Sequence, residues 1–202
     1  MLDTHAADPI AEWAVVKLGG SLLDLPGLVS KLAHWLNSMA RPSVLVVGGG
    51  GLVDWLRHMD ALHGLPCALT HELAIEMMRC NARWLTAMLP QAVLVSDFTT
   101  CQRAWRNHGQ PVLDPVTFCR HDSDLADALP VGWQVTSDSI AAQLAWRWRA
   151  AELVLLKSCH PPCHDWQRLA ELGLIDAHFP SIAHRLSVIR WVCWRDEPVN
   201  TA

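Results

Sequence analysis

Two glycine-containing stretches, each placed after a run of apolar residues, hold the residues of this sequence best suited to chemistry. The first is Lys17-Leu18-Gly19-Gly20-Ser21, and the second is Gly48-Gly49-Gly50-Gly51, which follows Val44-Leu45-Val46-Val47. Glycine loops present backbone N–H groups to an anion, and a helix that starts at the loop adds the positive end of its dipole. The two stretches and their lysine together predict a phosphate-binding site.

The glycine cluster alone would be a weak indication of such a site. Glycine after a strand can serve only to form a tight turn. The cluster also lacks the Lys-Ser or Lys-Thr that ends a Walker motif, and no acidic residue ends the second strand as in the dinucleotide fingerprint. The phosphate hypothesis therefore depends on both loops and Lys17 acting together.

Asp138 and Lys157 are two further candidates for this site. Asp138 lies in Thr136-Ser137-Asp138-Ser139, a cluster typical of the start of a helix. Its carboxylate could simply favour that helix, or it could be the counter-charge that orients lysines around a phosphate. Lys157 ends an apolar run, where it could contact phosphate or be a surface lysine whose stem packs on apolar neighbours. Both alternatives stay open at this stage.

The segment Cys159-His160-Pro161-Pro162-Cys163-His164 contains four potential metal ligands within six residues. Adjacent Cys-His pairs cannot easily face one tetrahedral ion, the C-x2-C spacing is absent, and no second cluster completes a site. We therefore expect a loop and no metal. A serine hydrolase is also unsupported, because the sequence has no Gly-x-Ser-x-Gly motif.

Apolar runs and helical patterns alternate along the chain, which predicts a doubly wound α/β sheet. Strands are expected at 12–18, 44–47, 93–95, 131–135, 153–156 and 188–194, and helices at 26–37, 52–62, 70–88, 140–150, 165–172 and 179–186. The stretch 99–129 is expected to hold short strands and a loop. In such sheets ligands bind at the carboxyl ends of the strands, where the candidate residues fall.

The longest predicted helix, at 70–88, has Thr70 as its expected N-cap and Glu72 in its first turn. An apolar stripe at helical spacing follows its length: Leu73, Met77, Cys80, Trp84 and Met88. We expect this stripe to face the core.

The composition indicates a packed soluble protein that does not bind nucleic acid. Apolar residues make up 51% of the 202 residues and charged residues 18%, which argues against disorder. The net charge is −4 with no basic block, unlike a nucleic-acid binder. No signal peptide or membrane span is recognisable, and seven scattered cysteines suggest reduced thiols in the cytoplasm. A tail at 1–10 and one domain at 11–202 are expected.

Three motifs, in this order, resemble the amino acid kinase superfamily, which includes acetylglutamate, carbamate, uridylate and isopentenyl phosphate kinases. They are Lys17-x-Gly19-Gly20-Ser21, the loop Gly48–Gly51 and Thr136-Ser137-Asp138-Ser139-Ile140-Ala141, followed by a helix and an apolar strand. They cover most of the chain. The resemblance implies a three-layer αβα sandwich with a mainly parallel central sheet, and a kinase that uses ATP and Mg²⁺ on a small phosphate or carboxylate acceptor.

Shorter stretches resemble the small archaeal-type kinases of methanofuran biosynthesis, which phosphorylate aminomethylfuran-methyl phosphate to its diphosphate. These stretches are His71-Glu72-Leu73-Ala74-Ile75, Trp133–Ser139 and Ile175-Asp176-x-x-Phe179-Pro180. The resemblance implies a role in one-carbon metabolism, with a small phosphorylated molecule as partner. Superfamily members are commonly dimers or hexamers, and tryptophans on helices are compatible with a homo-oligomer.

Carried over to this sequence, the resemblance gives each candidate a role. The catalytic positions are Lys17, Asp138 and Lys157, and the phosphate or nucleotide contacts are Gly19, Gly20, Ser21, Gly48, Gly49, Gly50, Gly51 and Ser137. His71 is expected on the acceptor side, although it is equally compatible with a plain first-turn residue.

This sequence departs from the superfamily in three places, and the first two fall on the adenine and ribose side. Ser158–Pro162 replaces an Asp-Val-Asp-Gly type loop, no glycine-containing nucleotide loop follows the last strand, and the lysine of several relatives near Pro180 is absent. Three hypotheses therefore stand. They are a kinase of a small phosphomonoester, a kinase of another acceptor, and a non-catalytic relative that binds an anion or nucleotide.

Overall fold

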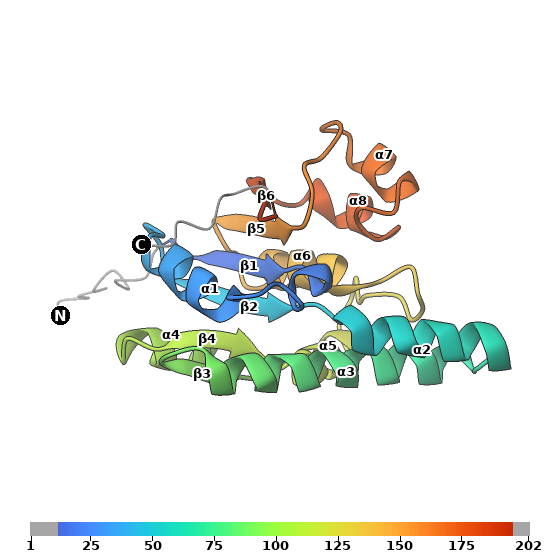
Figure 1. The fold of residues 1–202 in the computed structure, drawn as a ribbon, viewed down its shortest axis with the longest axis horizontal. Helices are drawn as coiled ribbons and strands as arrows, with labels where there is room; N and C mark the ends of the chain where they lie inside the picture. Colours follow the sequence, from blue (N-terminus) through green and yellow to red (C-terminus); the bar gives the residue numbers. More distant parts are fainter. Residues whose placement is uncertain (1–11, 196–202) are drawn as a thin grey trace, which may run out of the picture.

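A six-stranded parallel sheet forms the centre of the computed structural model, which describes residues 12–195 (Figure 1). The predicted tail at 1–10 lies outside the described residues. The strands are β1 (Ala14–Leu18), β2 (Ser43–Val47), β3 (Ala92–Val95), β4 (Gln110–Leu113), β5 (Glu152–Lys157) and β6 (Ile189–Cys193). Their spatial order is β3-β4-β2-β1-β5-β6, and every paired neighbour is parallel.

Helices cover both faces of the sheet, so the predicted three-layer αβα architecture is confirmed. The helices are α1 (Leu28–Asn37), α2 (Gly50–His63), α3 (Cys67–Met88), α4 (Phe98–Arg106), α5 (Pro115–Ser123), α6 (Ser137–Arg147), α7 (Trp166–Glu171) and α8 (Phe179–Ala183), with a 3-10 turn, η1, at Gly20–Leu22. Helix α1 and the second half of α3 pack on one face, and α4, α5, α6 and α8 pack on the other. Strands buried on both faces explain the continuous apolar runs.

The strand register brings the predicted site residues to one edge of the sheet. Strands β1 and β5 are neighbours, with Lys17 beside Leu155 and Leu18 beside Leu156. Lys157 is two residues beyond Leu155, so both lysines point to the same face, since side chains alternate along a strand. That face is the one covered by α6. The turn after β2 ends at this same edge.

Two secondary-structure predictions in the middle of the chain are wrong. The stretch 99–129 holds two helices and a strand, α4, β4 and α5, instead of short strands and a loop. Both helices start at aspartate N-caps, Asp97 and Asp114, whose side chains accept backbone hydrogen bonds. The expected strand at 131–135 is a loop. Short apolar runs occur in strands and in buried helices alike, so the pattern alone could not distinguish these structures.

The long helix α3 also differs from its prediction in start and orientation. It begins at Cys67, so Thr70 lies inside its first turn, buried, with its hydroxyl donating to the Cys67 carbonyl. The buried residues are Thr70, Ile75, Met78, Ala82 and Leu85. The predicted core stripe faces outward instead, with Cys80, Trp84 and Met88 exposed and Leu73 and Met77 half-buried. Both stripes have helical spacing, so periodicity alone could not choose between them.

Within residues 12–195, none of the helices combines the length and the apolar character that a bilayer crossing requires.

Candidate functional site

The two glycine loops pack directly against each other at the carboxyl ends of β1 and β2. The Gly19 N–H donates to the Leu156 carbonyl, and the Gly48 N–H donates to the Leu18 carbonyl, both at 2.9 Å. A Cβ added to Gly20 would lie 2.3 Å from the Gly50 nitrogen. Gly50 itself has φ +52°, a conformation that favours glycine. The glycines therefore permit a close backbone approach, and the N-cap residue of α2, Gly49, makes no side-chain cap hydrogen bond.

Alanine substitutions test whether the close packing of the two loops requires glycine. We expect Gly20→Ala to lower the free energy of unfolding by about 2 kcal/mol, because its methyl group must push the second loop away. Gly51→Ala is the matched control: a Cβ there meets nothing within 4 Å, so stability should stay the same or rise slightly. Urea denaturation measures both. A Gly20→Ala variant as stable as the parent chain would contradict this account of the loops.

Asn81 on α3 holds the second glycine loop and was not predicted from the sequence. Its side-chain nitrogen donates to the Gly48 carbonyl at 2.9 Å and to the Gly49 carbonyl at 2.8 Å. With both carbonyls held by Asn81, the loop's orientation at the start of α2 is fixed. A polar residue one helical turn from apolar neighbours gives no sequence signal of such a contact.

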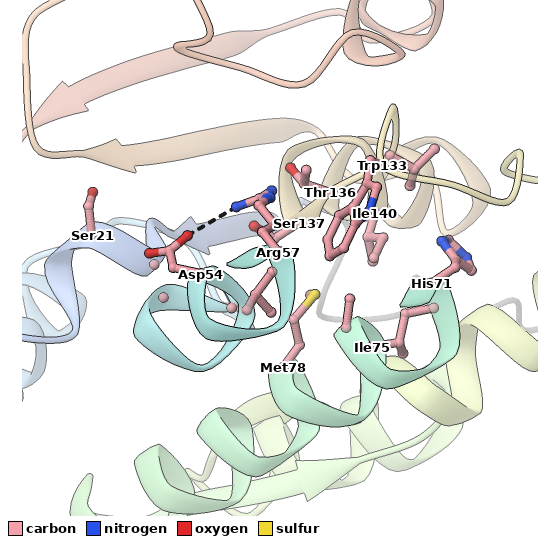
Figure 2. A pocket seen from close by; sticks show the side chains of 16 residues that line it. Ser21, Asp54, Arg57, His71, Ile75, Met78, Trp133, Thr136, Ser137 and Ile140 are labelled. Atoms are coloured by element: carbon pink, nitrogen blue, oxygen red, sulfur yellow. Dashed lines mark hydrogen bonds and ion pairs between the residues drawn. The ribbon is translucent and has the colours of Figure 1, made fainter. Parts of the chain in front are cut away.

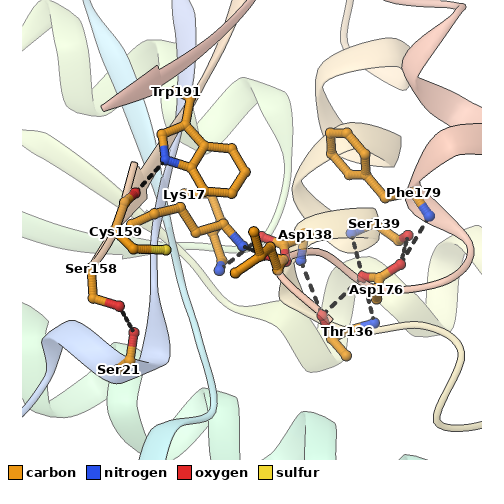
Figure 3. A network of polar contacts seen from close by, with 12 residues as sticks. Lys17, Ser21, Thr136, Asp138, Ser139, Ser158, Cys159, Asp176, Phe179 and Trp191 are labelled. Atoms are coloured by element: carbon orange, nitrogen blue, oxygen red, sulfur yellow. Dashed lines mark hydrogen bonds and ion pairs between the residues drawn. The ribbon is translucent and has the colours of Figure 1, made fainter. Parts of the chain in front are cut away.

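Lys17, Asp138 and Lys157 form one buried cluster. Figure 3 shows Lys17 beside Asp138. The Lys17 Nζ lies 2.8 Å from Asp138 Oδ1, and the Lys157 Nζ lies 2.7 Å from Asp138 Oδ2. Lys157 also donates to the Leu174 carbonyl at 2.7 Å. The three residues are only 4%, 4% and 8% exposed. Two lysines and one carboxylate leave a net positive charge, which suits an anion.

The three charged groups of the cluster shift one another's pKa values. Burial would raise the pKa of Asp138, but the charges and hydrogen bonds of Lys17 and Lys157 outweigh this and lower it to about 2. Burial and the nearby Lys17 charge lower the pKa of Lys157 to about 8, against the opposing pull of Asp138. Asp138 is therefore ionised at neutral pH, and Lys157 is close to its titration range.

Anion binding at this cluster should depend on pH through Lys157. Since the pKa of Lys157 is lowered to about 8, its charge is present below that pH and is lost as the pH rises through it. We expect affinity for sulfate, whose own charge is constant here, to fall between pH 7 and pH 9 in calorimetry. Lys157→Arg should bind with no such decline, because guanidinium keeps its proton. An equally steep decline in that variant would assign the titration to another group.

Asp176 fixes the N-terminus of α6 and therefore the position of Asp138. Its buried carboxylate accepts hydrogen bonds from the backbone N–H groups of Thr136, Ser139 and Phe179, each at 2.9 Å. It also accepts from the hydroxyls of Thr136 and Ser139 (Figure 3). The motif Ile175-Asp176-x-x-Phe179-Pro180 therefore has a structural role in this chain, because its aspartate holds the N-terminus of α6. A carboxylate at the positive end of a helix is favourable.

A cleft opens in front of the lysine cluster and continues beside the glycine loops. The part at the cluster is lined by both lysines, the first glycine loop and residues 173–177. The adjoining cavity of about 220 Å³ lies between α2, α3 and the start of α6, and Figure 2 shows its lining. Gly20, Ser21 and Thr136 line both parts. The two spaces therefore meet at the predicted phosphate site.

Arg57 and Trp133 stand where the two spaces meet and line both of them. The Arg57 guanidinium lies 5.0 Å from the centre of the Trp133 ring and pairs with Asp54 at 3.1 Å (Figure 2). The Trp133 indole N–H donates to Asp60 Oδ2 at 2.7 Å, which fixes the ring. The structure thus adds a third cation, Arg57, to the site. The sequence did not reveal it, because it lies two turns into α2.

His71 lines the far side of the cavity, together with the apolar side chains of Ile75, Met78 and Ile140. Its Nδ1 accepts a hydrogen bond from the Gly132 N–H at 3.3 Å, and burial lowers its pKa. The imidazole is therefore neutral at pH 7 and carries its proton on Nε2. A second apolar space of about 200 Å³ shares His71, Ile75 and Ile140 with this cavity.

The loop that follows Lys157 closes one side of the cleft. The Trp191 indole donates to the Cys159 carbonyl at 2.7 Å, and the Ser21 hydroxyl donates to the Ser158 hydroxyl at 3.0 Å. Over residues 12–195, no group of three or more His, Cys, Asp or Glu side chains is placed to hold a metal ion.

The structure brings together nearly all predicted site residues. Lys17, Asp138 and Lys157 are in contact, Gly19, Gly20 and Ser21 lie beside them, and Gly49, Gly50 and Ser137 line the adjoining cavity. Gly48 packs against Gly20, and His71 lies at the opposite end of the cavity. Gly51 is exposed in the first turn of α2 and lines neither space.

Comparison with known proteins agrees with this architecture. The uridylate kinase from Archaeoglobus fulgidus has a TM-score of 0.63 at 19% identity, with 90% of each chain covered. The UMP kinase from Ureaplasma parvum has a TM-score of 0.65 at 14% identity, covering 93% of this chain and 91% of that one. These likenesses show the fold. No curated protein sequence matches this chain. Residues 12–160 match the amino acid kinase family, and the chain belongs to that family.

Proposed function

We propose that this chain is a phosphotransferase that moves the γ-phosphoryl group of ATP to a small phosphomonoester. The observation that carries the proposal is the buried cluster of Lys17, Asp138 and Lys157 at the junction of two glycine loops and a cavity. Family membership supports phosphotransfer. The cavity beside the cluster supports a small acceptor, since about 220 Å³ is below the usual size of drug-like pockets.

The residues of the site fit the triphosphate of ATP with Mg²⁺. Bound there, MgATP would supply the transferable phosphoryl group together with much of the charge neutralisation. Gly20, Gly49 and Gly50 line the cleft without a side chain, so phosphate oxygens could approach the backbone there. Asp138 is paired with two lysines, and among residues 12–195 no group of three or more His, Cys, Asp or Glu side chains is placed to hold a metal ion. Mg²⁺ would therefore be held chiefly by phosphate oxygens.

Each charged residue has a separate task in this proposal. Lys17 and Lys157 face the phosphoryl group during its transfer and offset the negative charge on its oxygens. Asp138 keeps both ammonium groups in register, and Asp176 holds Asp138 through the N-terminus of α6. No general base is needed, because a phosphate oxygen of the acceptor is already an anionic nucleophile at neutral pH.

The acceptor would lie in the cavity between α2, α3 and the start of α6. Its phosphate would face Arg57, which stands beside the glycine loops, and its organic part would rest on Ile75, Met78 and Ile140. His71 at the far end can donate one hydrogen bond from Nε2. An acceptor with a small flat ring and one polar substituent suits this lining. The aminomethylfuran-methyl phosphate of methanofuran biosynthesis has these properties, and we propose it as the acceptor, in one-carbon metabolism.

A nucleoside monophosphate is the second candidate, because the fold resembles that of uridylate kinases. The apolar space beyond His71 could receive part of a larger acceptor. The two candidates differ in what they would place on Ile75 and Ile140, a single ring or a nucleoside.

Two measurements test the proposal. Thermal unfolding should shift upward with MgATP, and an ADP-release assay should then show turnover with the furan phosphate as acceptor. ADP formed only with UMP or another acceptor would overturn the furan assignment while keeping the kinase. No thermal shift and no ADP with any acceptor would overturn the kinase proposal and favour a non-catalytic anion-binding relative.

A further inference from the structure

The second apolar space, beyond His71, lies between α3, α5, the loop 124–136 and the start of α6. His71, Ile75 and Ile140 line both this space and the cavity beside the glycine loops. His71 lies at the end of that cavity away from Ser21 (Figure 2). The two spaces therefore adjoin, and an acceptor that extends past these three side chains would enter the second one.

Most of the wall of the second apolar space is uncharged. Burial raises the pKa of the Cys119 thiol to about 12, so this side chain is neutral at physiological pH. The aliphatic side chains in the wall are Ile75, Val116, Leu129, Val131 and Ile140. Such a wall favours a hydrocarbon or aromatic group with a few polar contacts at its edge.

Two charged groups next to this space are already balanced within the chain. The buried carboxylate of Asp122 lies 2.9 Å from the Arg147 Nε. The Arg79 Nε lies 3.2 Å from the buried carboxylate of Asp114. Neither pair therefore contributes net charge to a ligand in the second apolar space.

Two further carboxylates, Glu72 and Glu76, line the same space from one face of α3. Glu76 is only loosely paired, at 4.0 Å from Arg120 and 3.8 Å from Arg79. Glu72 lies one helical turn before Glu76, is exposed, and has no ion-pair partner among residues 12–195. With Arg120 as the cation in the lining, one negative charge is left without a counterpart.

We propose that the second apolar space recognises an ammonium group on the acceptor through the carboxylates of Glu72 and Glu76. A compact ammonium group can donate hydrogen bonds to both carboxylates and supplies the missing positive charge. The acceptor is then an aminoalkyl phosphomonoester, with its phosphate near Arg57 and its amine at the opposite end. This amine site rests on the proposed function, because it takes the cavity beside the glycine loops as the acceptor site.

The protonation of His71 explains why the amine would pass this residue. Its Nδ1 already accepts a hydrogen bond from the Gly132 N–H, and its Nε2 carries the proton. The imidazole therefore offers no free acceptor to an ammonium group. The nearest carboxylates along α3 are Glu72 and Glu76, in the second apolar space.

Two acceptors that differ only in the amine test the proposal. They are aminomethylfuran-methyl phosphate and the same molecule with a methyl group in place of its aminomethyl group. With the parent chain, kcat/KM should be about tenfold higher for the amine. Glu72→Gln should lower kcat/KM for the amine about fivefold, mainly through KM, and leave the methyl compound unaffected. Equal kcat/KM for both acceptors in the parent chain, or an unchanged preference in Glu72→Gln, would overturn the proposal.

Glu171→Gln is the matched control for this variant. Glu171 is an exposed glutamate on α7 that pairs with Arg168 at 2.8 Å and lines neither space. Its replacement should keep the tenfold preference for the amine. Glu72→Lys should instead favour an acceptor with a carboxylate in place of the amine, with unchanged circular dichroism. A Glu72→Lys variant that still prefers the amine would place the ammonium group elsewhere.

Binding without ATP separates the amine site from the proposed reaction. If no acceptor gives ADP, the phosphotransferase proposal fails, and calorimetry with the two furan phosphates decides on the amine site. Binding of the amine about tenfold tighter than the methyl compound, with most of that difference lost in Glu72→Gln, would support the site. Equal affinities, or no binding of either compound, would overturn it.

Discussion

Lys17→Ala should lower turnover about 10³-fold, the effect of removing one donor aimed at developing charge. Lys17 is buried on β1 and lies 2.8 Å from Asp138 Oδ1. Without it the cluster holds one lysine and one carboxylate, and its net positive charge is gone. The loss should appear mainly in kcat, because the glycine loops still bind phosphate through their backbone. Steady-state ADP release measures it.

Lys31→Ala is the control for this experiment. Lys31 on α1 donates to the Trp194 carbonyl at 2.8 Å and lines neither part of the cleft. Its replacement should leave kcat unchanged. If Lys17→Ala turns over within a few fold of the parent chain and remains folded, Lys17 does not face the transferring phosphoryl group.

Asp138→Asn should cost about 3 kcal/mol of unfolding free energy at pH 7 and abolish turnover. The substitution keeps the shape but leaves two buried lysines facing each other without a counter-charge. Asp138 favours the charged form of Lys157, so its removal lowers the pKa of Lys157 below its present value of about 8. Lys157 can then lose its proton, and the destabilisation should shrink as the pH rises from 7 to 9. Urea denaturation at both pH values measures this.

Asp97→Asn is the control, because it removes the charge of a carboxylate that caps a helix and has no lysine partner to neutralise. Asp97 is the exposed N-cap of α4, and its Oδ1 accepts from the Thr100 N–H at 2.8 Å. Asparagine caps a helix about as well as aspartate, so this change should cost only about a few tenths of a kcal/mol, with no effect on turnover. A destabilisation by Asp138→Asn that is as small, and independent of pH between 7 and 9, would show that the cluster is not held by its charges.

Much of the fold was predictable because apolar runs in a parallel sheet are continuous. β1, β2 and β5 were located correctly from those runs, and so was the alternation with helices. The outward face of α3 was not, since two stripes on that helix have helical spacing and only tertiary packing decides which is buried. The segment with α4 and α5 was missed although Asp97 and Asp114 are strong N-caps.

The candidate site was predictable where residue type and strand position coincide. Lys17 and Lys157 end neighbouring strands, and Asp138 starts the helix between them in the sequence, so topology brings them together. Arg57 and Asn81 were missed, because a residue in the middle of a helix reaches the site only through the packing of α2 and α3. Their contribution depends on distances that sequence spacing does not encode.

Phosphorus NMR of the full chain with MgATP and the furan phosphate tests the central claim most directly. If the lysine cluster and glycine loops carry out phosphoryl transfer, ADP signals should grow together with a new pair of diphosphate signals from the acceptor. The phosphomonoester signal should fall by the same amount. Unchanged ATP and acceptor signals, with the chain folded and UMP equally inert, would contradict the account.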